Sequence, residues 1–481
     1  MENLLTRRNT LVLVGAVALW HLYLSAQLQL HPDEAYYWLW SRYLDASYFD
    51  HPPMVAYFIR ISTLLSQSEL WVRLSGSVVL LLLSGLMWRL SLEIFKSVPV
   101  AAGSVMLFNV LPLTMLGLLV ITPDVPVLLF WSLGVYLFWR IMDGGRAWLW
   151  YPLGVVFGLA LLSKYTAILM VPCFFLYLVL TDERRWLRTV YPYLALGVGL
   201  LCFSPVLLWN SRHEWVSFTF QFRNGLGGQK LDVLNVGEYL AGQLLLSGPL
   251  VWVLGMYGAA VGLYRRDKPT LLLVCTAAPV ILFFAFSSLR KVAGPNWPAF
   301  AYFSLAILFT HYCLQGSSKV RRALWSVSLL SSLALSLTAT LHAQFHVLPL
   351  GRVSSELAAA DATNAFHGWR ELGAELKKYP GQLVAISPSH QLSAEIIYYT
   401  GAGVSAQVSR ASRPSQFNLL DPPHESPGKD RLYVWTEADF PDLDWARIAA
   451  SAFRTYREGQ VMRTYHVVSG QAAYVPPSLQ N

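Results

Sequence analysis

The sequence predicts a polytopic α-helical membrane protein that carries a small α/β domain at its C-terminal end. Of its 481 residues, 55% are hydrophobic and only 13% are charged, about half the charged share of a typical soluble domain. The mean hydropathy is +0.43, and apolar stretches long enough to span a bilayer recur along the first 350 positions. Mixed polar and apolar segments then replace them. We therefore expect a transmembrane domain over residues 1–348 and an outer domain over residues 349–481.

Hydropathy places eleven spans in the first domain, near residues 10–30, 74–94, 98–119, 124–140, 148–163, 165–181, 189–209, 239–263, 270–288, 297–314 and 322–347. The first is expected to be a retained helix rather than a cleaved signal peptide. Basic residues gather in alternate loops, which the positive-inside rule assigns to the cytoplasm. These loops carry Arg7 and Arg8, Arg89 and Lys96, Arg140 and Arg146, Arg184 to Arg188, Arg265 to Lys268, and Lys319 to Arg322.

Two features complete the predicted topology. The apolar stretch 147–181 is too long for one span, so we expect two short helices that meet near Lys164. An odd number of spans places the C-terminal domain outside. There, helices are expected at 368–379 and 394–401 and strands at 382–388 and 430–436, an alternation typical of a small α/β domain.

Composition also excludes several classes of function. The formal net charge of +8 is explained by the basic loops that orient the helices, so nucleic-acid binding is not expected. The four cysteines lie inside apolar runs, where no disulfide framework or CxxC metal site can be recognised. The chain has no convincing nucleotide-binding fingerprint, so a nucleotide sugar is not supported as a substrate.

Polar motifs gather at the outer ends of the predicted spans. They are HPDE (31–34), YFDHPP (48–53), TPDVP (122–126), SKYT (163–166), NSRHEW (210–215) and LRKVAGPNWP (289–298). The cytoplasmic loops offer little beyond the arginines that topology already explains. This convergence predicts one site at the outer membrane–water boundary.

Each motif also has a purely structural interpretation. Asp33, Glu34 and Asp124 are each placed to cap a helix, since each lies near a proline at an expected helix start. Lys164 could extend its ammonium toward the headgroups, although an ionisable residue amid apolar neighbours is a functional candidate. His51 could be an ordinary loop residue, and the tyrosines and tryptophans an interfacial aromatic belt.

The residue types suit one kind of chemistry when taken together. A carboxylate can remove a proton from a hydroxyl nucleophile or hold a divalent cation. Lysine and arginine can neutralise the oxygens of a departing phosphate. An aromatic-lined groove at membrane level suits an isoprenoid tail and the face of a sugar ring. The predicted reaction is therefore glycosyl transfer from a lipid-phosphate sugar.

The motifs DEAYYWLWSRYL, YFDHPP, TPDVP, LLSKYTAIL, LLWNSRHEWVSF and GPNWPA resemble those of bacterial GT-C glycosyltransferases of the protein-mannosyltransferase-like superfamily. The resemblance covers about residues 10–315 and is nearest to the lipid A aminoarabinose and galacturonic acid transferases. It implies a multi-pass enzyme of the bacterial inner membrane, with a polyprenyl-phosphate sugar donor, a cell-envelope acceptor and an active site that faces the periplasm.

The resemblance also implies roles for individual residues. Asp33 corresponds to an essential acid, with Glu34 beside it, whereas Lys164, His51 and either Arg290 or Lys291 correspond to groups that bind the donor phosphate. His51 stands where the aminoarabinose transferases have lysine, and Ala35 and Tyr36 also depart from their pattern, which argues against aminoarabinose as the sugar. Residues expected to support the substrate or a metal are Asp50, Asp124, Tyr37, Tyr48, Asn296 and Trp297.

Several alternatives stay open from the sequence. A transporter or lipid flippase would place ionisable residues at mid-membrane depth and show two related halves, neither of which is found here. A third hypothesis makes the tail a partner-binding module and the membrane part an anchor. The sequence identifies no cofactor, and a divalent cation is the candidate if one is used. The sequence names neither the sugar nor the acceptor.

Overall fold

The computed structural model describes residues 4–225, 227, 231–379, 383–401, 404–408, 413–420, 431–439, 451–457 and 459–469. The chain forms two compact units. The first comprises Met1–Ser25, Asp45–Leu65 and Arg73–Thr338, and the second comprises Ala26–Leu44, Ser66–Val72 and Ala339–Asn481. The second unit therefore includes two short segments from the N-terminal part of the chain as well as the C-terminal domain.

Among the described residues, six helices are long and apolar enough to cross a membrane. They are α1 (Arg7–Gln27), α4 (Glu69–Phe95), α7 (Asp124–Gly144), α10 (Tyr191–Arg212), α14 (Lys268–Ser288) and α16 (Lys319–Phe345). Two bent pairs raise this number to as many as eight: η2 and α9 with η3 (Tyr165–Leu180 and Asp182–Arg188), and α12 with α13 (Val233–Ser247 and Pro249–Arg265). The predicted multi-pass helical membrane protein is confirmed.

Shorter apolar helices occupy the remaining predicted spans. They are α5 (Val98–Val110) with α6 (Pro112–Gly117), η1 with α8 (Ala147–Leu149 and Trp150–Ser163), and η4 with α15 (Ala299–Ala301 and Tyr302–Leu314). Each is shorter than the roughly 20 residues that cross a bilayer without tilt or thinning. Eleven crossings therefore stay a prediction, although every predicted interval contains helix in the described chain.

Breaks in the helices follow local backbone chemistry. Lys164 has an extended backbone (φ −157°, ψ 133°) between the end of α8 and the start of η2, as predicted for two helices that meet there. Gly248 has φ +81° between α12 and α13, a conformation that favours glycine, and Pro249 begins the next helix. These breaks bend the chain where a straight helix would continue.

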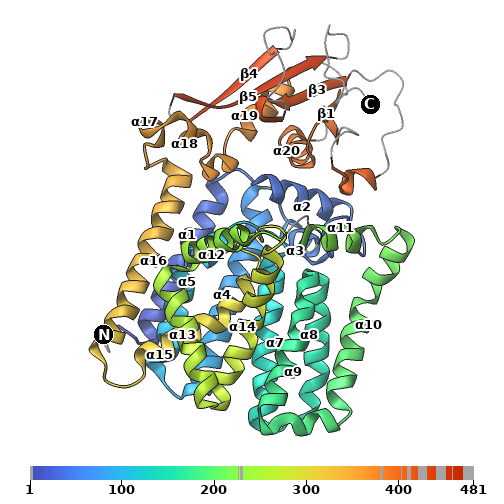
Figure 1. Ribbon diagram of the computed structural model, residues 1–481. Coiled ribbons are helices and arrows are strands. Elements are labelled where there is room, and N and C mark those ends of the chain that lie inside the picture. The colour runs from blue at the N-terminus through green and yellow to red at the C-terminus, as the bar shows by residue number, and fades with distance from the viewer. Residues whose placement is uncertain are drawn as a thin grey trace. The chain divides into compact units, whose positions relative to one another are not determined.

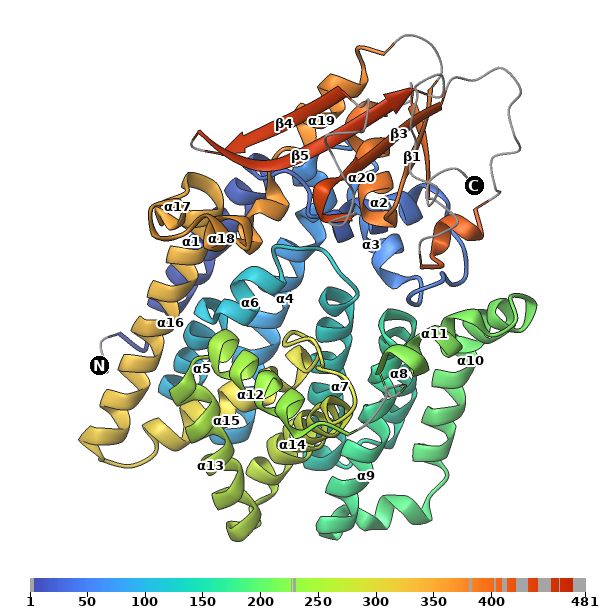
Figure 2. The same ribbon diagram turned by 45° about the horizontal axis from the view of Figure 1, so that its top comes forward.

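Helices α7, α8 and α10 of the first unit run side by side in both views (Figures 1 and 2). Small residues allow α8 and α10 to approach closely. A Cβ at Gly154 would lie 2.5 Å from the Ala195 carbonyl oxygen, and one at Gly158 would meet Cys202 Cβ and lie 2.8 Å from the Gly199 oxygen. Such small-residue contacts are typical of packing between membrane helices.

The second unit contains a five-stranded mixed sheet of strand order β2-β1-β3-β5-β4. Its strands are β1 (Leu383–Ser387), β2 (Val404–Val408), β3 (Arg431–Thr436), β4 (Ser451–Arg457) and β5 (Gln460–Ser469). β1 pairs in parallel with β2 and β3, whereas β5 pairs antiparallel with β3 and β4. Gly459, with φ +77°, allows the tight turn between β4 and β5.

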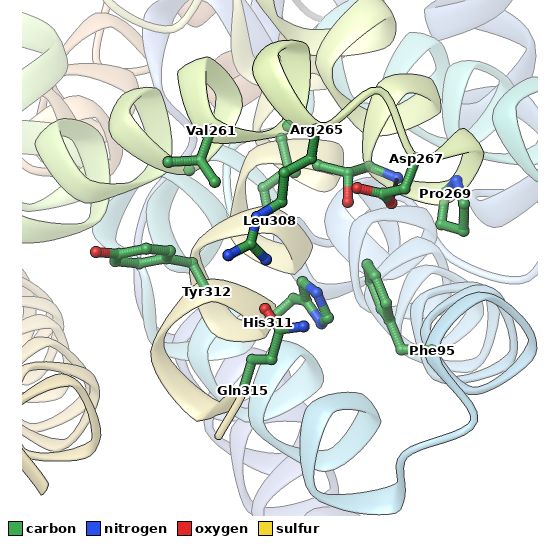
Figure 3. A pocket seen from close by; sticks show the side chains of 12 residues that line it. Phe95, Val261, Arg265, Asp267, Pro269, Leu308, His311, Tyr312 and Gln315 are labelled. Atoms are coloured by element: carbon green, nitrogen blue, oxygen red, sulfur yellow. Dashed lines mark hydrogen bonds between the residues drawn. The ribbon is translucent and has the colours of Figure 1, made fainter. Parts of the chain in front are cut away.

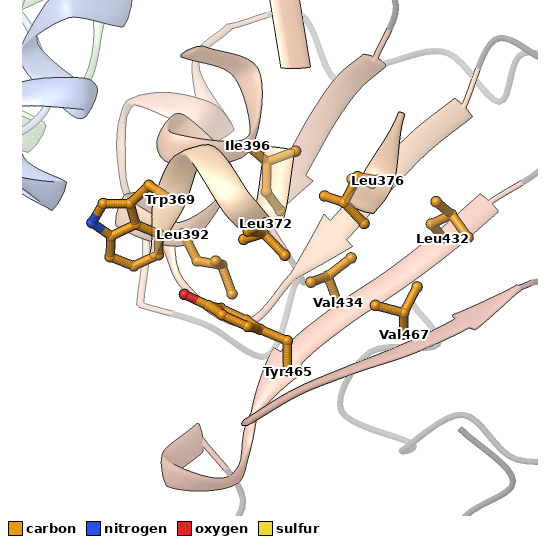
Figure 4. Close-up of a cluster of buried hydrophobic side chains, with 10 residues drawn as sticks. Trp369, Leu372, Leu376, Leu392, Ile396, Leu432, Val434, Tyr465 and Val467 are labelled. Atoms are coloured by element: carbon orange, nitrogen blue, oxygen red, sulfur yellow. The ribbon is translucent and has the colours of Figure 1, made fainter. Parts of the chain in front are cut away.

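Helices α19 (Trp369–Leu376) and α20 (His390–Thr400) pack on this sheet through an apolar core (Figure 4). The core comprises Trp369, Leu372, Leu376, Ala385, Leu392, Ile396, Leu432, Val434, Tyr465 and Val467. The predicted α/β domain is confirmed, with both predicted helices and both predicted strands present; Gln382 and Asp430, at the edges of those strands, lie outside the described residues. The prediction missed β2, β4 and β5.

Candidate active site

Asp124 is the centre of a polar cluster in the first unit. It is the first residue of α7, but its side chain does not cap that helix. Instead, Lys164 Nζ donates to Asp124 Oδ1 over 2.6 Å, and Asn296 Nδ2 donates to Asp124 Oδ2 over 2.7 Å. Both carboxylate oxygens are therefore engaged, and three residues from distant parts of the chain, all predicted for the site, come together.

Lys164 is well placed to hold a second anion. Its side chain is 9% exposed and that of Asp124 13%, so the ion pair is largely removed from water. In the described part of the chain, Nζ has only Asp124 as a hydrogen-bond partner, and an ammonium carries three donors. The indole ring of Trp297 lies 6.0 Å from Nζ, at the outer limit of a cation–π contact.

The turn that presents Asn296 and Trp297 is held by backbone and side-chain hydrogen bonds. The Trp297 N–H donates to the Gly294 oxygen over 2.9 Å, and the Gln243 side chain donates to the Pro295 oxygen over 2.9 Å. Buried Gln243 in turn accepts from the Tyr302 hydroxyl over 2.7 Å. Gln243 and Tyr302 thus position the turn, and sequence reasoning gave no signal for either.

Asp50 and His51 lie in a turn that α11 (Val216–Gly225) holds. The Gln221 side chain donates to the Asp50 carbonyl oxygen over 2.5 Å and lies 3.3 Å from His51 Nδ1. The His51 carbonyl oxygen accepts from the Tyr48 N–H over 3.2 Å. Asp50 is buried and His51 is half-buried. Helix α11 therefore holds the turn through the Asp50 carbonyl group and the His51 imidazole.

Tyr48 is fully buried rather than open to a substrate. Its hydroxyl accepts from the Asp45 N–H over 3.1 Å, and burial raises the pKa of the phenol above its usual value. The Asp45 carboxylate accepts from Trp209 Nε1 of α10 over 2.7 Å. Asp45 was not predicted; as another acid of the same outer loop, it could have been named from the sequence.

Arg290 and Lys291 follow α14 and have exposed side chains. Lys291 Nζ donates to Asn224 Oδ1 over 2.7 Å, which connects this loop to the end of α11. In the described part of the chain, Lys291 has no hydrogen bond or ion pair to Asp124 or Lys164. Their assignment to donor phosphate stays a prediction.

Asp33 and Glu34 belong to the second unit, in the first turn of α2 (Pro32–Arg42). His31 is the N-cap: its Nδ1 accepts from the Asp33 N–H, and Glu34 Oε2 accepts from the His31 N–H over 2.9 Å. Glu34 thus completes a capping box and is fully buried. The Asp33 side chain is 42% exposed, and Gln391 Nε2 lies 3.4 Å from Oδ1.

The aromatic residues after this acidic pair hold α2 within the second unit. Tyr36 accepts from the Gln416 N–H over 2.7 Å and meets His390 edge-on at 4.5 Å between ring centroids. Tyr37 is buried against Trp40, with ring centroids 4.9 Å apart. Tyr36 and Tyr37 therefore pack inside the second unit, and the substrate-supporting role predicted for Tyr37 stays a prediction.

Comparison with known proteins gives these residues a context. Residues 50–209 match the family described as dolichyl-phosphate-mannose-protein mannosyltransferase. This segment of the chain is therefore similar to that family. The resemblance to the superfamily that the motifs indicated is confirmed.

Two known proteins extend the comparison. The lipid A galacturonosyltransferase RgtD of Rhizobium johnstonii (strain DSM 114642 / LMG 32736 / 3841) is 27% identical over 321 residues, which cover 63% of this chain and 64% of RgtD. The crystal structure of ArnT from Cupriavidus metallidurans bound to undecaprenyl phosphate superposes with a TM-score of 0.67 at 15% identity, over 97% of this chain and 99% of that one. Its apo structure gives 0.66 at 16% identity, over 95% and 97%. The superposition shows that the chain has the ArnT fold.

A divalent cation, the candidate cofactor, would need a group of acids and histidines. In the described part of the chain, the group with spacing suited to a metal is His342, His346 and Asp361 of the second unit. The His342 Nδ1 accepts from the Leu348 N–H over 3.0 Å, so Nε2 carries the proton that it shares with Asp361. Arg457 Nη1 lies 3.2 Å from the same carboxylate oxygen. These contacts describe an ion-pair network and do not fit a metal site.

Proposed function

We propose that this chain is a glycosyltransferase that moves a sugar from a polyprenyl phosphate to a cell-envelope acceptor on the periplasmic side of the bacterial inner membrane. Two relatives support the substrate classes: RgtD acts on lipid A, and ArnT has been crystallised with undecaprenyl phosphate. The alternation of basic loops supports the orientation. RgtD favours a lipid A acceptor within this class.

The observation that carries the proposal is the buried Lys164–Asp124–Asn296 cluster. Breaking the bond between the sugar and the donor phosphate leaves an additional negative charge on the phosphate, and cations held in a site of low polarity stabilise that charge strongly. Lys164 has donors beyond the one that Asp124 uses. Asp124 pairs with the ammonium, and Asn296 fixes the direction of the Asp124 carboxylate.

Asp33 has two roles under this proposal, and the acceptor decides between them. With a hydroxyl acceptor, Asp33 takes the hydroxyl proton, the oxygen attacks the anomeric carbon, and the bond to the donor phosphate breaks. With a lipid A phosphate, the nucleophile is already ionised and needs no base, so Asp33 orients the substrate. The exposed carboxylate of Asp33 supports either role better than buried Glu34 does.

The test compares the envelope lipids of cells that contain and lack the gene. Mass spectrometry of lipid A, core oligosaccharide and envelope glycolipids is expected to show one species heavier by one sugar residue when the chain is present. Complementation with Lys164→Met is expected to remove that species, whereas Lys96→Gln, in a basic loop, is expected to retain it. Unchanged lipids in all strains, or transport of a labelled lipid without sugar transfer, would overturn the proposal.

A further inference from the structure

A cavity of about 190 Å³ lies in the first unit, among helix ends that carry basic loops. Its lining comes from the last turn of α13, the first turn of α14, the last turns of α15, and Phe95 at the end of α4 (Figure 3). These ends terminate apolar helices, so the cavity opens at the level of lipid headgroups. It involves none of the residues assigned to glycosyl transfer.

Three polar side chains, those of Arg265, His311 and Gln315, can bind a ligand in the cavity through hydrogen bonds. The Arg265 side chain points into it toward His311 and Gln315 (Figure 3). In the described part of the chain, no ion pair or hydrogen bond engages the Arg265 guanidinium, and the buried Nδ1 of His311 has no partner. Each group would gain a hydrogen bond from a ligand oxygen.

The charges around the cavity favour an anion. Asp267 also lines it, but this carboxylate accepts from the Thr270 N–H over 3.0 Å as the N-cap of α14. Arg321 Nη1 donates to the Tyr312 carbonyl oxygen over 2.9 Å, which offsets the negative end of α15. Arg265 and Arg321 outweigh Asp267, and the positive end of the α14 dipole offsets part of the negative ends of α4 and α13.

Most of the remaining lining is apolar. The His311 imidazole stacks on Phe95, with ring centroids 3.7 Å apart and an interplanar angle of 12°. Val261 and Leu308 complete the wall. A cavity with a cationic mouth and an apolar wall fits a phosphate group that carries an aliphatic tail.

We infer that this cavity binds a phosphate group, held by Arg265 and His311, at the membrane face opposite the proposed catalytic site. The group belongs either to an anionic phospholipid or to a soluble phosphate ester. Arg265 forms the charge-assisted contact, and His311 donates from Nδ1. The inference does not depend on the proposed glycosyl transfer, because binding is measured without a sugar donor.

The test uses the purified full-length protein and matched arginine variants. Native mass spectrometry from micelles that contain equal amounts of phosphatidylglycerol and phosphatidylcholine is expected to retain one phosphatidylglycerol molecule. Arg265→Gln is expected to weaken this binding by at least about tenfold. Arg266→Gln, which removes an equal charge from the next residue outside the lining, is expected to leave it unchanged.

Further arms identify the source of the phosphate and guard against misfolding. Inorganic phosphate that raises the melting temperature of the wild type but not of Arg265→Gln would assign a soluble ester; protection by phosphatidylglycerol vesicles alone would assign a lipid. His311→Phe keeps the stack on Phe95 and is expected to weaken binding as well. Equal loss in the Arg265 and Arg266 variants, or no loss in Arg265→Gln and His311→Phe, would overturn the inference.

Discussion

Lys164 Nζ and Asp124 Oδ1 lie 2.6 Å apart in a part of the first unit that is largely removed from water. Forty positions separate the two residues, one at the break between α8 and η2 and the other at the start of α7. Burying two charges is unfavourable unless they pair closely and find further hydrogen bonds, and Asn296 supplies one of these. The pair therefore couples stability to the proposed phosphate chemistry.

Single and double variants of this pair separate its effect on stability from its effect on sugar transfer. Lys164→Met leaves the Asp124 carboxylate buried without its cation, so we expect the free energy of unfolding to fall by about 3–5 kcal/mol. Lys164→Met combined with Asp124→Asn removes both charges and is expected to recover most of that loss without restoring transfer. Denaturation of the purified variants and a transfer assay measure the two effects. Near-normal transfer by the double variant would contradict the proposed role of Lys164.

The adjacent acids Asp33 and Glu34 are expected to respond differently to the loss of charge. Asp33→Asn changes an exposed side chain, so we expect normal expression, a stability within about 0.5 kcal/mol of wild type, and abolished transfer. Glu34→Gln perturbs a buried carboxylate of the capping box and is expected to lower stability by about 1 kcal/mol. Thermal melting and transfer assays on the pair distinguish a catalytic acid from a structural one; near-normal turnover in Asp33→Asn would refute its assignment.

The candidate site was predictable where charge appeared in an apolar context. Asp124, Lys164 and Asn296 stood out at the outer ends of spans, and the structure joins them by two hydrogen bonds. Gln243 and Gln221 were missed because an amide at the edge of an apolar helix is unremarkable until its partner is known. Both bond to main-chain oxygens of turns distant in sequence, which no local pattern encodes.

The fold was predictable where it depends on local sequence, and it was not predictable where it depends on contacts between residues far apart in the chain. Long apolar runs and basic loops indicated the membrane helices, because hydropathy is a local property. The hairpin of β4 and β5 was missed although SAFRTYREGQVMRTYHVVS alternates around Gly459, a signal that could have been used. The place of α2 in the second unit was not predictable, because Tyr36 packs on residues more than 350 positions away.

Because α8 and α10 approach each other closely, replacing a glycine between them by alanine is expected to lower the stability of the protein. Gly158→Ala would normally stabilise a helix, but here the new Cβ meets Cys202 and the Gly199 carbonyl. We expect a loss of about 1–3 kcal/mol, which a lowered melting temperature would report. Gly15→Ala in α1 is the matched control, because its Cβ would meet nothing within 4 Å. Equal melting temperatures for the two variants would contradict the close packing.

The lowered pKa of buried His390 makes the stability of the second unit depend on pH. Burial, followed by the nearby Arg413 guanidinium, lowers the pKa of His390 from 6.5 to about 3. Arg413 Nη2 lies 3.0 Å from Nε2, so the imidazole is neutral and accepts there. The unfolded chain protonates near pH 6.5 and the folded one does not, so stability falls as the pH drops below about 6.5, by about 2 kcal/mol at pH 5.

His390→Gln tests this dependence, because it removes the titrating group and keeps a polar side chain. Burial also lowers the pKa values of His367 and His466, so the variant is expected to flatten the decline of the melting temperature between pH 7 and pH 5 rather than abolish it. The informative quantity is the difference between wild type and variant across that range. Parallel curves would mean that His390 is already protonated in the folded state, against the burial and the Arg413 contact that keep it neutral.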